Sequence, residues 1–149
     1  MIDEKIKMTG HVDIVVTDKD GNVKDTRSVK NLVLTTGKTF IAASMLKTTT
    51  NSPVAMSHMA IGAGTASAAV GDTAMGSQLG RVSLATATSS GAVVTYTASF
   101  PAGTGTGAVT EAGIFNNSSG GDMLCRTVFS VVNKGSDDAM SITWTVTVS

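Results

Sequence analysis

Residues 140–148 alternate strictly between apolar and hydroxyl side chains. Met140, Ile142, Trp144, Val146 and Val148 fall on one side, and every residue between them is Ser or Thr. A period of two is the pattern of a β-strand with one buried and one wetter face. This stretch therefore predicts a sheet whose apolar side needs a second layer to cover it.

The same type of pattern recurs along the chain between short segments rich in Asp, Asn, Ser and Gly, which are typical of turns. One helix is predicted near residues 36–47, where Ile41 and Met45 are spaced i, i+4 and Thr35 or Thr36 could cap the first turn. A single helical turn is expected over 73–79. The other predicted strands are 7–17, 23–30, 56–61, 81–88, 92–100, 108–115 and 123–132.

Short antiparallel strands with a single helix predict a mainly β fold, an antiparallel β-sandwich of jelly-roll-like form. The 149 residues suit one domain, 1–149, with an amino-terminal hairpin over about residues 6–30. We expect this hairpin to be a docking element whose removal leaves a folded core. The residues expected in the core are Ile61, Tyr96, Phe100, Phe115, Ile142, Trp144 and Val146.

The stretch 108–115 contains a carboxylate, Glu111, in the middle of a predicted strand with apolar neighbours. Alternation places Val109, Glu111 and Phe115 on one side of that strand. A buried carboxylate is costly unless it is paired. We therefore predict that Glu111 bonds backbone amides or forms a structural ion pair with Arg81, another lone charge in a weakly charged region. No second acid or nucleophile accompanies Glu111, so a catalytic role is not expected.

Composition and motifs argue against several functions. The 11 basic and 11 acidic residues provide no basic field for nucleic acid, and no run of 18 apolar residues predicts a membrane span. The start of the chain has no apolar segment of a secretory signal. Gly37-Lys38-Thr39 lacks the upstream glycine of a phosphate-binding loop, and Gly62-x-Gly64 lacks the third glycine of a dinucleotide site. We therefore expect no cofactor.

Metal and thiol chemistry have little support in the sequence. His11 and His58 lie alone in separate predicted strands, whereas metal sites need three or four converging ligands. Cys125, the one cysteine, lies in an apolar strand pattern and is expected to be a small core residue. We therefore expect no metal site and no enzyme activity. Charged residues make up only 15% of the chain, which indicates a surface that is covered in an assembly.

A series of spaced motifs resembles small structural proteins of tailed bacteriophages, described as tail-collar, tail-fibre, head-fibre or decoration proteins. The resemblance covers about residues 8–149. The sequence lacks the long fibrous extension of receptor-binding members, which favours a compact building block. The motifs, in order, are Asn31–Lys38 (NLVLTTGK), Met56–Gly64 (MSHMAIGAG), Gly71–Ala74 (GDTA), Leu79–Val82 (LGRV), Thr110–Phe115 (TEAGIF), Met123–Arg126 (MLCR) and Ile142–Thr145 (ITWT).

The resemblance implies a non-enzymatic virion protein that associates with itself, as a trimer, and docks on other virion proteins such as capsid, neck or tail components. Head decoration (cement), head fibre, collar and tail fibre remain open positions. Loops 48–55, 62–72 and 101–107 are the expected docking segments. The alternative is a carbohydrate-binding β-sandwich module used in host attachment, although the few aromatic residues occupy predicted core positions.

Overall fold

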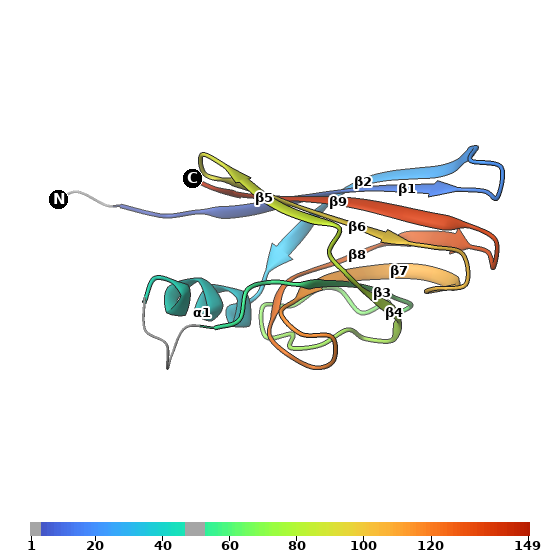
Figure 1. The fold of residues 1–149 in the computed structure, drawn as a ribbon. Coiled ribbons are helices and arrows are strands. Elements are labelled where there is room, and N and C mark those ends of the chain that lie inside the picture. The colour runs from blue at the N-terminus through green and yellow to red at the C-terminus, as the bar shows by residue number, and fades with distance from the viewer. Residues whose placement is uncertain (1–3, 47–52) are drawn as a thin grey trace.

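The structure is a computed structural model that describes residues 4–46 and 53–149. Its strands and its one helix follow the predicted order closely, and Figure 1 shows their arrangement. The elements are β1 (Met8–Thr17), β2 (Val23–Val33), α1 (Thr35–Ser44), β3 (His58–Gly62), β4 (Gln78–Ser83), β5 (Thr86–Ser90), β6 (Val93–Phe100), β7 (Gly107–Phe115), β8 (Met123–Lys134) and β9 (Ala139–Val148).

The strands form one antiparallel sheet with the order β4-β3-β7-β8-β2-β1-β9-β6-β5. The sheet curls into two layers, which lie one above the other in Figure 1. The upper layer holds β2, β1, β9, β6 and β5, and the lower layer holds β8, β7, β3 and β4. The end of β2 joins them, because Leu32 and Val33 pair with Arg126 and Cys125 of β8. The predicted mainly β, antiparallel, sandwich-like fold is confirmed.

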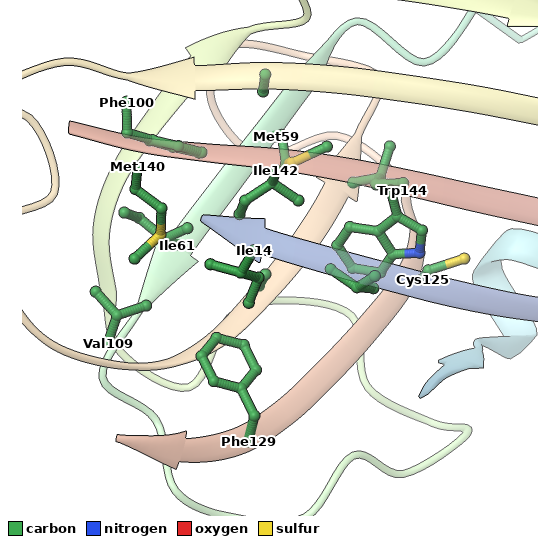
Figure 2. Close-up of a cluster of buried hydrophobic side chains, with 14 of the residues drawn as sticks. Ile14, Met59, Ile61, Phe100, Val109, Cys125, Phe129, Met140, Ile142 and Trp144 are labelled. Carbon is green, nitrogen blue, oxygen red and sulfur yellow. The ribbon is translucent and has the colours of Figure 1, made fainter. Parts of the chain in front are cut away.

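The main hydrophobic core fills the space between the two layers (Figure 2). Trp144, Ile142 and Phe100 from the upper layer and Ile61 from the lower layer have no exposed surface. Val146 is also buried there, and Tyr96 packs on the core while remaining half-buried. Most of the predicted core is therefore found between the layers.

Phe115 differs from the other predicted core residues. It is buried, but it belongs to a second, smaller cluster with Leu34, Ala60 and Met123. The register of β7 on β8 shifts between Val109 and Glu111, so simple alternation fails there. Val109 and Phe115 are predicted to lie on the same side of this strand. In the structure Val109 packs in the main core and Phe115 in the smaller cluster.

The amino-terminal hairpin is part of the sandwich. β1 pairs with β2 on one side and with β9 on the other, so it is an interior strand of the upper layer. Its Val12, Ile14 and Val16 are buried in the main core. The expectation that residues 1–30 can be removed from a folded core is therefore wrong, because their removal would expose β9 and the apolar side of the sandwich.

Three local predictions need correction. Residues 73–79 form no helix, and β4 begins within them at Gln78. The predicted strand 81–88 is broken at Leu84, where the chain crosses from the lower to the upper layer: Leu84 N–H donates to Ser57 O, and Ala85 N–H donates to Thr97 O. No side chain caps α1, whose preceding residue is Leu34. Lys47, the predicted end of the helix, lies outside the described residues.

Candidate functional site: a pinned loop and an uncharged face

The segment 63–77 connects β3 to β4 and contains mostly Gly, Ala and Ser. Such a composition predicts a flexible loop, yet the loop is tied to the body of the protein at several points. Thr35 N–H donates to Val70 O at 2.8 Å, and Ala63 N–H donates to Ser77 O at 2.7 Å, which joins the two ends of the loop. Met75 packs on the smaller apolar cluster. The loop therefore covers the second face of the lower layer.

Glu111 of β7 is the centre of these ties, and it is completely buried. One carboxylate oxygen, Oε1, accepts the backbone N–H of Ser77 at 2.7 Å. The other, Oε2, accepts the N–H of Gly76 at 2.9 Å and two N–H groups of Arg126, from Nε at 3.1 Å and from Nη2 at 2.7 Å. Both oxygens are thus occupied by donors.

Arg126 of β8 extends this cluster toward the middle of the loop. Its Nη1 donates to Asp72 Oδ2 at 2.9 Å, and its Nη2 also donates to Ala66 O at 3.2 Å. Asp72 Oδ2 in turn accepts the backbone N–H of Ala69 at 2.9 Å. One guanidinium therefore joins two carboxylates and a carbonyl, and it fixes the loop 63–77 to β7 and β8.

Glycines make room for the carboxylate of Glu111. A Cβ atom added to Gly64 would lie 2.6 Å from Glu111 Oε2, and one added to Gly62 would lie 2.4 Å from Ser77 O. Neither distance is compatible with a side chain. The Gly62-x-Gly64 pattern, which superficially resembles part of a nucleotide-binding loop, thus has a structural cause: the loop passes directly over a buried carboxylate.

The electrostatics of the cluster fit a structural role. Burial raises the pKa of Glu111, but the hydrogen bonds from Ser77, Arg126 and Gly76 outweigh it, so the pKa lies below its ordinary value. A general base must reach its substrate, whereas Glu111 has no exposed surface and its carboxylate already accepts four hydrogen bonds. The cluster therefore holds the loop and is unsuited to proton transfer.

The predicted ion pair between Arg81 and Glu111 is wrong, since the partner of Glu111 is Arg126. Arg81 of β4 lies over the ring of Phe115, with its Cζ 3.7 Å from the ring centroid. Its Nη1 donates to the carbonyls of Asn117 and Gly120, at 3.0 and 2.9 Å. Arg81 thus fixes the β7–β8 turn, while the alternative prediction, that Glu111 bonds backbone amides, is confirmed.

A second buried charge holds the turn between β8 and β9, and sequence reasoning did not single it out. Lys134 is almost fully buried, and its Nζ donates to Pro101 O at 2.9 Å and to Asp138 O at 2.7 Å. The Asp138 carboxylate accepts Lys24 Nζ at 2.6 Å and the Gly135 N–H at 2.7 Å. Like Arg126, this lysine satisfies backbone carbonyls and stabilises a connection.

Both histidines have hydroxyl neighbours, but neither arrangement is a catalytic triad. Ser28 Oγ and Asp13 Oδ1 both contact the same ring nitrogen of His11, Nε2, at 2.7 and 3.2 Å. A triad needs the carboxylate on one ring nitrogen and the nucleophile on the other. His58 contacts Ser57 and Ser83, and no carboxylate of residues 4–46 or 53–149 is among its hydrogen-bond partners.

An apolar groove of about 260 Å³ lies between α1 and the inner side of the upper layer. Phe40 and Ile41 of α1 form one wall, and Tyr96, Val146 and Val148 are on the other. The remaining aromatic side chains are buried: Trp144, Phe100, Phe115 and Phe129. Within the described residues, the aromatic rings therefore form no exposed platform.

The outer side of the upper layer is dominated by hydroxyl groups. No charged residue occurs between Arg81 and Glu111 or after Asp138, so the three adjacent strands β5, β6 and β9 are uncharged. Side chains that point away from the core meet across these strands, with Thr86, Thr97 and Thr143 in one row. We call this surface the hydroxyl face. It consists of Thr86, Thr88, Ser90, Thr95, Thr97, Ser99, Ser141, Thr143, Thr145 and Thr147, with Val93 between Ser90 and Thr147.

No group of three or more His, Cys, Asp or Glu side chains in residues 4–46 and 53–149 is arranged to hold a metal ion. In the same part of the chain, no helix has the length and hydropathy to span a membrane. Comparison with known proteins finds no match to any protein-family model, curated protein or solved structure.

Proposed function

We propose that this protein is a non-enzymatic structural component of a tailed-bacteriophage virion, which associates with itself and docks on other virion proteins. Its position is either at the head, as decoration (cement) or head fibre, or at the neck, tail collar or tail fibre. The motif series that resembles such proteins supports the proposal, and the trimer that this resemblance implies is one form the self-association could take.

The observation that supports this proposal most is the hydroxyl face. Charged side chains normally cover the exposed side of a sheet, whereas β5, β6 and β9 have none. Protein interfaces are depleted of charged residues at their centre, because each charge would have to be desolvated. A surface of hydroxyl groups can pack against another subunit and form hydrogen bonds without that cost.

The pinned loop supports the same role. A docking segment binds more tightly when it is ordered before it meets its partner, because less conformational entropy is lost. The loop 63–77 is ordered by Glu111 and Arg126, although its composition is typical of a flexible linker. Of the expected docking loops, 62–72 lies in this ordered segment except for Gly62, the last residue of β3. The loop 101–107 is described as well, and 48–55 lies partly outside the described residues.

Quantitative mass spectrometry of purified phage particles tests the proposal, with the major capsid protein as the reference. Hundreds of copies per particle would indicate a head decoration protein, and about a dozen, or a small multiple of three or six, would indicate the neck, collar or tail. Absence of the chain from purified particles would refute the virion role.

Two matched substitutions test the hydroxyl face itself. Thr145→Glu places a charge within the face, on β9 opposite Thr95 of β6, and Thr26→Glu makes the same change on the charged strand β2 of the same layer. We expect Thr145→Glu to reduce incorporation into particles at least tenfold while the thermal midpoint of the isolated protein changes little. Thr26→Glu should be incorporated normally, and equal incorporation of the two variants would exclude the face as a docking surface.

The alternative proposal is a carbohydrate-binding module. Sugar-binding faces of β-sandwiches usually present aromatic rings, and in the described residues the rings are buried or line the groove beside α1. Clear saccharide binding by the isolated protein on a glycan array, together with its absence from virions, would favour this alternative over the structural role.

A further inference from the structure

The strand β5 is the terminal strand of the upper layer and pairs with β6 on one side. An edge strand leaves every second backbone N–H and C=O group without a partner in the sheet, and these groups can pair with a strand from another chain. Natural proteins protect such edges with charged side chains, proline, bulges or covering loops. The sheet edges of this protein differ in such protection.

β5 has none of these protective features. Its sequence, Thr86-Ala87-Thr88-Ser89-Ser90, contains no charge and no proline, and all five residues are exposed. Its five pairs with β6 run without a register shift, so no bulge turns the edge away. The strand is therefore regular and accessible over its whole length.

The exposed part of β2 and the terminal strand β4 are protected. β2 has Lys24, Asp25, Arg27 and Lys30, and Arg27 Nη2 donates to Val131 O of β8 at 3.2 Å, which bridges the two layers. β4 has a charged residue, Arg81, and its register on β3 shifts between Ile61 and Gly62. Of these three edges, β5 alone is both uncharged and regular.

We propose that β5 pairs with β5 of a second copy of this chain, in antiparallel orientation about a two-fold axis at Thr88. The five-residue strand is self-complementary in this register: Thr88 faces Thr88, Ala87 faces Ser89, and Thr86 faces Ser90. Cross-strand pairs of Thr and Ser are favourable, and no like charges meet. Such a contact is isologous, with the same surface patch on both subunits.

Pairing at β5 also has a consequence for the hydroxyl face. The upper layers of the two copies become one continuous sheet, and their hydroxyl faces join on one side of it. A two-fold contact predicts a dimer or another even-numbered assembly, in place of the trimer that the family resemblance implies. This inference deepens the self-association in the proposed function, but it concerns the isolated chain and can fail or succeed independently of the virion role.

Light scattering coupled to size-exclusion chromatography tests the inference on the purified full chain. We expect a mass twice the 15.1 kDa of the chain for the natural sequence, and a single-chain mass for Thr88→Lys. Thr145→Lys, a matched change two strands inward on the same face, should remain a dimer. A monomeric or trimeric natural protein, or a Thr88→Lys variant that stays dimeric, would overturn the inference.

Cross-linking gives a second test that does not depend on the folding of the lysine variant. In the proposed register two facing residues have Cβ atoms about 4.5–5.5 Å apart, and a small movement of the two edge strands brings them to the roughly 3.5–4.5 Å of a disulfide. Thr88→Cys should therefore oxidise to a covalent dimer, whereas Thr145→Cys should not. A Thr88→Cys protein that remains monomeric after oxidation would contradict the pairing.

Discussion

Arg126 on β8 lies directly opposite Gly113 on β7 and reaches diagonally to Glu111, where its Nη2 is 2.7 Å from Oε2. The glycine matters because a side chain at this position would meet the sulfur atoms of Met123 and Met75 at 3.0 Å. The arginine carries the link onward to Asp72 in the loop 63–77. One pair of side chains thus couples the register of two strands to the position of the longest described loop.

Replacing Glu111 by glutamine tests this coupling. The substitution keeps the shape but leaves the buried Arg126 with a weaker partner, and breaking a buried ion pair costs about 3–5 kcal/mol. Because Asp72 still contacts Arg126, we expect a loss near the lower limit, about 3 kcal/mol in the free energy of unfolding at pH 7. Urea denaturation measures it. Glu4→Gln, the same change at an exposed residue, is the control, and equal stability of the two variants would contradict the structural role of Glu111.

The stability lost in Glu111→Gln should depend on pH. The pKa of Glu111 in the folded protein lies below its ordinary value of 4.5. The unfolded chain therefore takes up this proton first as the pH falls, and the stabilisation by Glu111 is complete above pH 4.5 and lost toward the lower folded pKa. The difference in stability between the natural protein and Glu111→Gln should be constant from pH 7 to 5 and should decrease below 4.5. A difference that grows on acidification would have the wrong sign.

Sequence periodicity was sufficient to predict most of the fold. The strand from Ala139 to Val148 is the clearest example, because each apolar residue from Met140 to Val146 is buried and the residues between them are outward-facing. Alternation is informative where one face is buried and the other is not. It fails in β7, where every residue from Val109 to Phe115 is buried and the register shifts. Both sides of this strand are covered, so the sequence shows no alternation between a polar and an apolar side.

The partner of Glu111 could not be found in this way. Arg81 and Arg126 are both lone charges in apolar strand patterns, and the choice between them depends on which strands are neighbours. β7 lies between β3 and β8, so Arg126 is on an adjacent strand while Arg81, on β4, is one strand further away. The isolated arginine in Met123–Arg126 is visible in the sequence as a candidate partner. Selecting it over Arg81 requires the order of the strands, which is a property of the tertiary fold.

The glycines of the loop 63–77 provide a test of how closely the loop is held. A methyl group at position 64 would lie 2.6 Å from Glu111 Oε2, whereas one at position 71 would have no heavy atom within 4 Å. We expect Gly64→Ala to lower the free energy of unfolding by about 1–3 kcal/mol, as is typical of overpacking. Gly71→Ala, in the same loop, should be neutral or slightly stabilising, since alanine restricts the unfolded chain. Thermal denaturation compares the two, and equal midpoints would indicate that the loop is not held as described.

Cys125 lies in β8 between the two layers and has no exposed surface, and burial raises the pKa of its thiol to about 12. The thiolate is the reactive form of cysteine, and the pKa of a free thiol is about 8.5. At pH 8 we therefore expect Cys125 to react with a disulfide reagent such as Ellman's reagent at least about a thousandfold more slowly in the folded protein than in guanidinium. Ser118→Cys adds a thiol at an exposed loop position and should show one fast and one slow reaction. Fast reaction of Cys125 in the folded natural protein would mean that the two layers separate often enough to admit the reagent.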